Sequence, residues 1–335
     1  MLKLGYKASS EQFGPTELLD YARLAEECGY DSVWISDHFQ PWRHTHGHAP
    51  FSLAWLGALG AHTRRIVMGT SVLTPTFRYH PSVVAQAFAT LGMLFPGRVV
   101  LGLGTGESLN EVPASAIEWP EQKERTARFR EAVRLIRELW TAERVSFEGQ
   151  YYRTRLATIY DRPATPVPLY IAGAGPFMAK LAGLEADGFI CTSGKKWQLY
   201  TETLLPNLAA GLAASGRAGS ADYDRLIEMK VSFDTDAARA LNDTHFWGAL
   251  ALTPEEKTDV EDPIQMERLA DALPVERTAS RWIVSTDPAE MVERIGKYVD
   301  LGFNHLVFHA PGPDQARFIR LFGERVLPLL RARFG

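Results

Sequence analysis

The stretch from Ser36 to His48 reads S-D-H-F-Q-P-W-R-H-T-H-G-H and holds four of the nine histidines of the chain. Imidazole groups at alternate positions could bind a metal ion, whereas a single histidine could act as a general base. His44, His46 and His48 would share one face only if this segment were a strand. A proline and a glycine within the stretch indicate a loop instead, so we expect no metal site here.

His38 and Glu107 are the candidate base and acid. His38 follows the apolar run V-W-I, and Glu107 follows the run V-V-L-G-L-G-T-G. A histidine can accept one proton and a carboxyl group can give another. An alternative for Glu107 is that it only complements the positive N-terminus of the helix that follows it. Asp37 adjoins His38, but neighbours on a strand point to opposite sides, so it need not orient the imidazole.

Three cations come from segments that are far apart in sequence, namely Lys195, Lys257 and Arg281. Together with the hydroxyl group of Thr192 they would suit the dianion of a phosphomonoester. The alternative for each of them is a solvated charge on the surface.

Glycine-rich turns offer a second kind of binding site. Gly102, Gly104 and Gly106 have the spacing G-x-G-x-G, which does not match the dinucleotide motif G-x-G-x-x-G. Small residues still let the backbone approach a planar ring or a phosphate group closely. The turn at Gly173 to Gly175 precedes a helix and could offer amide groups to an anion. Ordinary tight turns would explain both segments equally well.

These residues need a scaffold that brings strand ends together. Short apolar runs without polar alternation are typical of strands that are buried on both faces, and amphipathic helical stretches lie between them. Eight such strand and helix units predict a (β/α)₈ TIM barrel, in which the carboxyl ends of the strands carry the active site. A doubly wound sheet is the alternative. The predicted strands are Lys3–Lys7, Ser32–Ser36, Ile66–Val72, Val99–Gly104, Leu169–Ala172, Gly188–Thr192, Glu228–Phe233 and His305–His309.

The length of 335 residues fits a single barrel domain over residues 1–335. Two insertions interrupt the alternation of strands and helices. Residues 142–166 read as a hairpin, and residues 234–280 form a long, polar, partly helical segment. Long excursions of a barrel usually build the rim of its active site.

Composition argues against several classes of function. The formal net charge is −4 and the chain has no basic block, so we expect no nucleic acid as a partner. The two cysteines are far apart, which is typical of reduced thiols and not of a disulfide framework. The N-terminus lacks an apolar signal region and no apolar run is long enough to span a bilayer, so we expect a cytoplasmic protein without a membrane partner.

Four motifs carry a resemblance to a known family: S-D-H-F-Q-P-W, G-T-S-V-L-T-P-T-F-R-Y-H-P, G-L-G-T-G-E-S-L-N-E and G-F-I-C-T-S-G-K. In these motifs the chain resembles the luciferase-like barrel oxidoreductases. More narrowly, it is similar to the coenzyme F420-dependent glucose-6-phosphate dehydrogenases of actinobacteria, from Leu2 to near the C-terminus. The resemblance implies a (β/α)₈ fold, a homodimer, and a deazaflavin bound at the carboxyl face of the barrel.

The resemblance also assigns residues to the cofactor. It implies a cis peptide bond between Ser71 and Val72, against which the ring of coenzyme F420 would rest. The family usually has A-A-G-G where this chain has A-G-A-G at Ala172 to Gly175, so the side chains of that turn differ. The cofactor contacts implied by the family are Asp37, Ser71, Val72, Thr74, Thr105, Gly106, Glu107, Asn110, Ala172, Gly173 and Ala174.

The chemistry implied by the family uses the same acid and base candidates. His38 would take the proton from the C1 hydroxyl group of glucose 6-phosphate while hydride leaves C1 for C5 of F420, and Glu107 would protonate N1. Trp42 would stabilise the histidine or the developing charge; the alternative is an aromatic wedge in a loop. The phosphate would be held by Thr192, Lys195, Lys257 and Arg281, and the product would be 6-phosphogluconolactone.

Two other functions stay open on the sequence alone. Another oxidoreductase of the same barrel, dependent on F420 or FMN, would not need the cluster of cations. A metal-dependent barrel hydrolase would need ligands at several strand ends, and of those ends only that of the last strand adds a histidine, His309.

Overall fold

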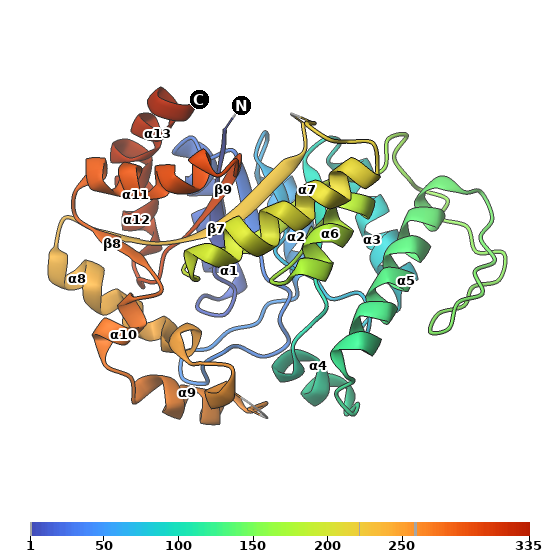
Figure 1. Cartoon of the computed structure of the whole chain (residues 1–335), viewed down its shortest axis with the longest axis horizontal. Coiled ribbons are helices and arrows are strands. Elements are labelled where there is room, and N and C mark those ends of the chain that lie inside the picture. The colour runs from blue at the N-terminus through green and yellow to red at the C-terminus, as the bar shows by residue number, and fades with distance from the viewer. Residues whose placement is uncertain (1, 221, 258–259) are drawn as a thin grey trace.

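Eight parallel strands close into a barrel in the computed structural model, which describes residues 2–220, 222–257 and 260–335. Each strand pairs with its neighbours in parallel, and the last closes the ring by pairing with the first and with the seventh. The predicted (β/α)₈ barrel is therefore confirmed (Figure 1). The barrel strands are β1 (Lys3–Ala8), β2 (Ser32–Ile35), β3 (Val67–Thr70), β4 (Val99–Leu103), β5 (Leu169–Ala172), β6 (Gly188–Thr192), β7 (Asp224–Phe233) and β9 (His305–His309).

Helices surround the barrel and begin where the sequence signals them. Gly14 precedes a helix with proline at its first position, and the carboxylate of Asp287 accepts a hydrogen bond from the amide of Ala289 at the start of another. The helices outside the rim insertion are α1 (Pro15–Glu27), α2 (Ser52–His62), α3 (Pro81–Leu94), α4 (Ser108–Ser115), α5 (Gln122–Thr141), α6 (Pro176–Glu185), α7 (Leu205–Ala214), α11 (Pro288–Asp300), α12 (Gln315–Arg325) and α13 (Leu327–Phe334).

The seventh strand differs from its prediction. It begins at Asp224 and not at Glu228, and its last residues pair with an additional strand, β8 (Ile283–Ser285), that the sequence pattern did not indicate. A strand of three residues is too short to show a periodic pattern, which is why it was missed. Its short sheet extends the barrel wall on the side of the second insertion.

The interior of the barrel is a packed core. Trp34 and Tyr170 stack with ring centroids 5.9 Å apart, and smaller apolar side chains from other strands complete the cluster. A Cβ atom at Gly69 would lie 2.7 Å from the Trp34 ring, so the neighbouring strand must carry glycine there. The centre of the barrel is therefore filled with side chains and is not a pore.

A polar network lies at the amino ends of the strands. Nε2 of His305 lies 2.7 Å from the hydroxyl oxygen of Ser32, and its Nδ1 lies 3.4 Å from Oδ2 of Asp224. Lys3 donates to the same carboxylate at 2.7 Å. The Ser32, Asp224 and His305 side chains are buried. This end of a barrel usually serves stability, while the opposite end carries chemistry.

Two segments extend from the barrel as excursions (Figure 1). Residues 142–166 form a hairpin whose arms meet at two isolated antiparallel bridges, Val145 with Ala157 and Glu148 with Arg153. Residues 234–280 contain α8 (Ala237–Asn242), α9 (Pro263–Asp271) and α10 (Val275–Ala279), with 3₁₀ turns at Asp243–Ala251 and Glu255–Lys257.

The second insertion has a small hydrophobic core of its own, formed by Ala249, Leu252, Val260, Met266 and Ala270. None of the helices in the described ranges is long and apolar enough to cross a membrane.

Candidate functional site

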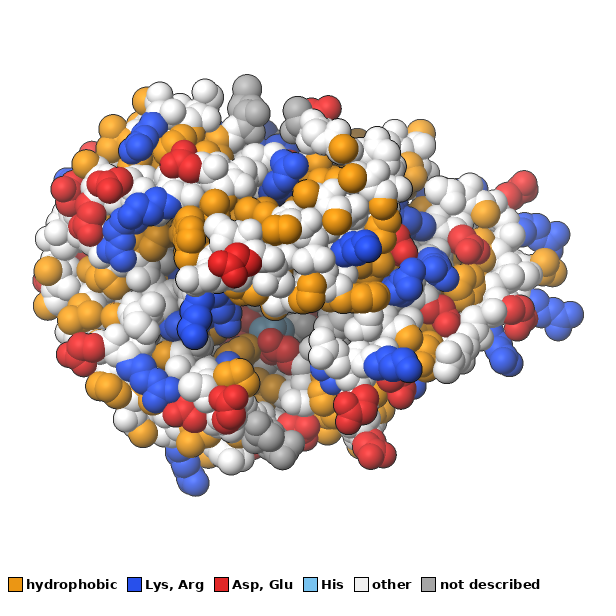
Figure 2. Space-filling model, viewed as in Figure 1, with side chains coloured by type: hydrophobic (Ala, Val, Ile, Leu, Met, Phe, Trp, Pro, Cys, Tyr) orange, Lys and Arg blue, Asp and Glu red, His pale blue; other side chains and the backbone are white. Residues whose placement is uncertain are grey.

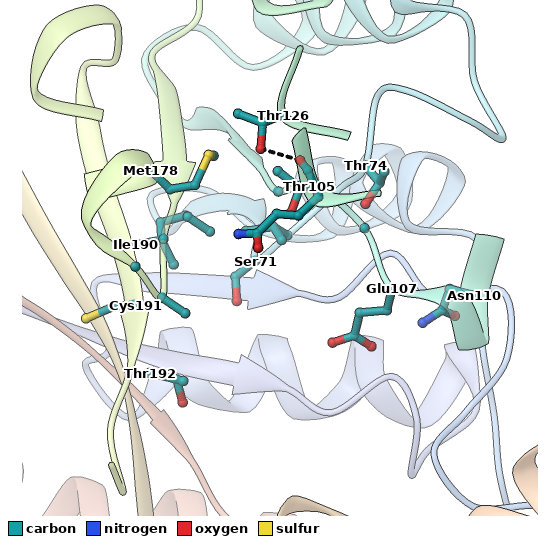
Figure 3. Close-up of a pocket in the computed structure, with 18 of the residues that line it drawn as sticks. Ser71, Thr74, Thr105, Glu107, Asn110, Thr126, Met178, Ile190, Cys191 and Thr192 are labelled. Carbon is teal, nitrogen blue, oxygen red and sulfur yellow. Dashed lines mark hydrogen bonds between the residues drawn. The ribbon is translucent and has the colours of Figure 1, made fainter. Parts of the chain in front are cut away.

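A cavity of about 610 Å³ opens at the carboxyl ends of the barrel strands. Its volume lies in the range that is typical of cofactor and substrate pockets. Figure 2 shows a hollow in one face of the molecule, with Lys or Arg side chains at its edge and histidine atoms inside it. The walls include His38, Thr192 and every predicted cofactor contact: Asp37, Ser71, Val72, Thr74, Thr105, Gly106, Glu107, Asn110, Ala172, Gly173 and Ala174. Figure 3 labels Ser71, Thr74, Thr105, Glu107, Asn110 and Thr192 among them.

One wall of the cavity is backbone. The peptide bond between Ser71 and Val72 is cis, as the family resemblance implies. A Cβ atom at Gly104 would lie 2.6 Å from Cγ2 of Val72, and Gly106 has a φ of 85° that favours glycine. The small residues of G-L-G-T-G therefore allow the loop after β4 to lie against the Ser71–Val72 peptide.

His38 forms an ion pair with a carboxylate that was not among the predicted residues. Nδ1 of His38 lies 2.7 Å from Oε1 of Glu11, which is buried in the loop after β1. Burial disfavours the imidazolium, but the Glu11 carboxylate outweighs burial, so the pKa of His38 is raised. Burial opposes ionisation of Glu11 as well, yet His38 and Lys7 lower the pKa of Glu11 to about 2. The ionised carboxylate of Glu11 thus favours the protonated form of the histidine.

Asp37 is held by other groups and does not orient His38. The hydroxyl group of Ser52 donates to its Oδ1 at 2.6 Å, while Arg78 and Tyr79 donate to its Oδ2 at 2.8 and 2.9 Å. Arg78 also donates to the Asp37 carbonyl oxygen at 2.7 Å. Asp37 therefore fixes the end of β2, and its carboxylate oxygens are already engaged.

Asn110 fixes the loop that follows His38. Its Oδ1 accepts hydrogen bonds from the backbone amides of Phe39 at 2.8 Å and Gln40 at 3.1 Å. Its Nδ2 is buried without a partner in the described part of the chain, in a side chain that lines the cavity. A buried amide group that lacks an acceptor is ready to donate to a ligand. Nearby, Glu107 lies at the N-cap position of α4 and also faces the cavity (Figure 3).

A second cavity, of about 530 Å³, is lined by Lys195, Arg281 and Lys230 among others. A Cβ atom at Gly194 would lie 2.4 Å from the carbonyl oxygen of Arg281, so the two loops that carry these cations touch at a glycine. Partial burial, together with the charges of Arg281, Lys230 and Lys257, lowers the pKa of Lys195 to about 8. These cations repel one another, which an anionic ligand would relieve.

Lys257 and Trp42 lie against each other. The ammonium nitrogen of Lys257 is 4.6 Å from the centroid of the Trp42 ring, within the range of a cation–π interaction. Trp42 also packs on the hydrophobic core of the second insertion. Its neighbour Arg43 pairs with Glu267 at 3.0 Å and with Asp271 on α9. Trp42 and Arg43 thus fasten the loop after β2 to the insertion.

The remaining histidines of the opening stretch do not converge. His44, His46 and His48 are all exposed, on the loop that leads to α2. Within residues 2–220, 222–257 and 260–335, no three His, Cys, Asp or Glu side chains are arranged so that they could hold a metal ion.

The fit to a deazaflavin follows from three features of the cavity. Its volume suits a large cofactor, its glycine-rich wall admits a planar ring, and the Nδ2 of Asn110 offers a buried donor without an acceptor. The turn from Gly173 to Gly175 at the start of α6 adds backbone amides that suit an anionic group. The residues present therefore fit a group with a flat ring and an anionic tail.

Comparison with known sequences gives full-length relatives. Residues 2–305 match the family model of the luciferase-like monooxygenases. A protein of Nakamurella multipartita named F420-dependent glucose-6-phosphate dehydrogenase is 66% identical over 334 residues, covering 100% of this chain and 98% of that protein. A protein of the same name from Mycolicibacterium smegmatis is 60% identical over 331 residues, covering 98% of each.

Solved structures agree with this placement. An F420-dependent secondary alcohol dehydrogenase in complex with an F420–acetone adduct superimposes with a TM-score of 0.92 and 33% identity, over 98% of this chain and 99% of that chain. The F420-dependent tetrahydromethanopterin reductase of Methanopyrus kandleri, at 21% identity and a TM-score of 0.82 over 98% and 99%, shows the same fold. The chain belongs to the luciferase-like monooxygenase family, in the branch of the F420-dependent glucose-6-phosphate dehydrogenases.

Proposed function

We propose that this protein oxidises glucose 6-phosphate to 6-phosphogluconolactone with coenzyme F420 as the hydride acceptor. The observation that carries the proposal is the His38–Glu11 ion pair in a cavity next to a cluster of cations. A base near a phosphate-binding site is what the oxidation of a sugar phosphate at C1 requires. The names of the full-length relatives, at 60–66% identity, support the same activity.

His38 is the proposed base. Because Nδ1 faces Glu11, Nε2 is the nitrogen that would accept the proton of the C1 hydroxyl group. Glu11 then stabilises the imidazolium that forms, much as a buried carboxylate supports a histidine in other acid–base sites. Coenzyme F420, when bound, supplies the hydride chemistry.

Glu107 is the proposed acid. It faces the cavity from the start of α4, on the loop whose glycines face the Ser71–Val72 peptide. From there it would place a proton at N1 of the deazaflavin. The proton taken by His38 and the proton given by Glu107 belong to different atoms, so the two residues do not compete.

The phosphate group would be held by Thr192, Lys195, Lys257 and Arg281. Thr192 lines the first cavity and Lys195 and Arg281 line the second, while Lys257 lies on Trp42 at the edge of the insertion. Charge-assisted hydrogen bonds to a dianion are stronger than bonds to neutral groups. Free glucose lacks this dianion and should therefore bind much more weakly than glucose 6-phosphate.

The direct test is loss of the absorbance of oxidised F420 when glucose 6-phosphate is added to the purified protein. NADP and FMN in place of F420 are the controls for cofactor choice, and glucose in place of its phosphate ester is the control for the anion. Turnover with FMN but not with F420 would favour the alternative of an FMN-dependent oxidoreductase.

We further propose a homodimer. Val83 and Leu94 lie three helical turns apart on one face of α3 and are 51% and 62% exposed, with Met93 beside them at 49%. An exposed apolar face of this kind is typical of an interface. Light scattering of the wild type should give twice the mass of the chain, and Leu94→Glu should shift the protein toward half that mass. A monomeric wild type would contradict this.

A further inference from the structure

A chain of charged side chains, two buried lysines and a carboxylate that lines the cavity, has no part in the chemistry proposed above. It consists of Lys7 on β1 and of Glu228 and Lys230 on β7, and we term it the Lys–Glu–Lys chain. Lys7 and Lys230 are each only 3% exposed. Burying an ammonium group is costly unless it is paired and hydrogen-bonded, so the contacts of these lysines identify what they serve.

Lys7 uses its ammonium group on the backbone wall of the cavity. Its Nζ donates to the carbonyl oxygen of Ser71 at 2.7 Å, to the hydroxyl oxygen of Ser71 at 2.9 Å, and to the hydroxyl oxygen of Ser36 at 2.8 Å. Its three protons match these three acceptors. Lys7 thus ties Ser71 to Ser36, at the start of the loop that carries His38.

The other end of the chain reaches the expected phosphate site. Oε2 of Glu228 lies 3.5 Å from Nζ of Lys7, and its Oε1 lies 3.2 Å from Nζ of Lys230. Lys230 in turn hydrogen-bonds the hydroxyl group of Thr192. Ser71 and Thr192 project into the same cavity (Figure 3), so the chain links its cofactor wall to its phosphate side.

The chain also contributes charge near the base. Two lysines and one carboxylate give it a net charge of +1. The neighbouring His309 adds no charge at neutral pH, because burial lowers its pKa although Glu228 acts to raise it. The charged groups that face His38 are Glu11 from the loop after β1, Glu107 from the start of α4, and Lys7 from β1. Of these, only Lys7 opposes protonation of the imidazole.

We propose that Lys7 is a positioning residue that holds Ser71 in place for the cofactor and whose charge helps to set the pH at which His38 can act as a base. This inference rests on the proposed function, because it assigns Ser71 to the cofactor and His38 to the base. Lys7 itself contacts neither the substrate nor the reacting atoms.

The test compares Lys7→Met with a matched control, Lys3→Met. Both lysines lie on β1 and both pair with a carboxylate, but Lys3 contacts Asp224 at the amino end of the barrel. We expect Lys7→Met to raise the dissociation constant of oxidised F420, measured by its fluorescence, about tenfold, since both charge-assisted hydrogen bonds that hold Ser71 are lost. Lys3→Met should leave that constant within about twofold.

The second readout is the pH profile of kcat/KM for glucose 6-phosphate. Removal of the positive charge of Lys7 favours the imidazolium form of His38. The acidic limb of the profile should therefore move to higher pH in Lys7→Met. Lys7→Arg keeps the charge and should keep the limb, while its planar group serves the three acceptors less well and weakens F420 binding. If Lys7 served folding alone, the acidic limb would stay at its wild-type pH in both variants.

Folding of the variant is favoured by the pairing that remains. Lys7→Met leaves Glu228 paired with Lys230, so the chain becomes neutral and no carboxylate is left alone. If Lys7→Met lacks a native circular dichroism spectrum, Lys7→Gln, which keeps a donor, takes its place in the same comparison.

A double variant tests whether Lys7 acts through Ser71. The effect of Ser71→Ala on F420 binding should be smaller in Lys7→Met than in the wild type, because the two changes remove the same contact. Wild-type F420 affinity and an unmoved limb in Lys7→Met would overturn the proposal, and so would an equal loss in Lys3→Met. Failure of the wild type to reduce F420 would instead overturn the proposed function.

Discussion

At the scale of single residues, the candidate base depends on a partner from another part of the chain. His38 and Glu11 are 2.7 Å apart across the mouth of the barrel. An isolated histidine would exchange its proton freely near neutral pH, whereas a buried carboxylate fixes one ring nitrogen and leaves the other for the substrate. The pair would therefore set both the direction and the pH range of the proposed proton transfer.

The raised pKa of His38 predicts the pH dependence of activity. Only the neutral imidazole can accept a proton, so kcat/KM should rise with pH through a value above the ordinary 6.5 of histidine. Glu11→Gln removes the charge that raises this pKa, and the acidic limb should then move to lower pH. The maximal rate should also fall about tenfold, as expected for a loss of ~1.4 kcal/mol of charge stabilisation. A pH–rate profile of both proteins checks this; an unmoved limb would contradict the pairing.

Glu107→Gln should separate proton donation from binding. The amide cannot donate a proton to N1, so we expect kcat to fall about 100-fold, the lower end of what general acid–base groups contribute. KM for glucose 6-phosphate should change little. Steady-state kinetics at saturating F420 provide the measurement, and a large rise in KM at unchanged kcat would reassign Glu107 to binding.

The sequence indicates which residues follow the strands, but it does not indicate which of them contact one another. His38 and Glu107 follow strands directly, so their place at the mouth of a barrel could be predicted. Glu11 lies in the polar run S-S-E-Q after β1, which is a signal of the same kind. Nothing in the sequence, however, indicates which side chain of that run turns toward His38. The buried lysines of β1 and β7 were missed because a charged residue in a strand usually faces solvent.

At the scale of elements, the loop after β2 and the second insertion form one unit of the rim. Trp42 packs on the core of the insertion, and Arg43 pairs with Glu267 and Asp271 of α9. Lys257 lies on the Trp42 ring at the same junction. Trp42 thus packs between the loop and the insertion as an aromatic wedge would. Its ring also lies against Lys257, which is one of the residues proposed to bind the phosphate group.

This junction predicts a shared effect on substrate binding. Lys257→Met should raise KM for glucose 6-phosphate about tenfold with a small change in kcat. Trp42→Leu keeps apolar packing but removes the ring face, so KM should rise about threefold to tenfold, the range of a partly desolvated cation–π contact. The two effects should be less than additive in the double variant. A loss confined to kcat in Trp42→Leu would instead support a role beside His38.

The elements were predicted as far as their patterns allow. Strands buried on both faces and helices with proline near their first turn were identified because these signals are local. The strand β8 depends on pairing with a segment more than 50 residues away, and the true start of β7 depends on pairing with β6, more than 30 residues away. No local pattern encodes such pairings. For the same reason the insertion could be recognised as helical but not placed against Trp42.

At the scale of the whole molecule, the two ends of the barrel divide stability from chemistry. Charged groups at the carboxyl ends face a cavity, whereas Ser32, Asp224 and His305 at the amino ends are buried and bonded to one another. The arrangement of these three resembles a catalytic triad in its order of contacts. Its burial and its place in the barrel point to stability.

This buried network predicts loss of stability in acid. Burial lowers the pKa of His305 despite the attraction of Asp224, so the folded protein keeps this imidazole neutral where the unfolded chain protonates it. Unfolding therefore takes up a proton below about pH 6.5, and stability falls as the pH drops through that value. The pKa of Asp224 is lowered too, and its contribution is lost only at more acidic pH.

Melting temperatures between pH 7.5 and 5 check the prediction. His305→Gln cannot take up that proton, so its melting temperature should be lower at pH 7.5 but should fall less steeply toward pH 5. His309, whose pKa is lowered by burial as well, keeps part of the slope in both proteins. If the melting temperatures of the wild type and of His305→Gln fall in parallel as the pH decreases, His305 does not contribute to the acid sensitivity.

The core of the second insertion has a consequence for how such enzymes diversify. Because Ala249, Leu252, Val260, Met266 and Ala270 pack mainly on one another, substitutions among them need not disturb the barrel strands. The second insertion can therefore change in length and charge while the cavity at the strand ends stays intact. A chimera that carries residues 234–280 of a relative should therefore keep its affinity for F420, while Lys257 and the other groups of the insertion are replaced.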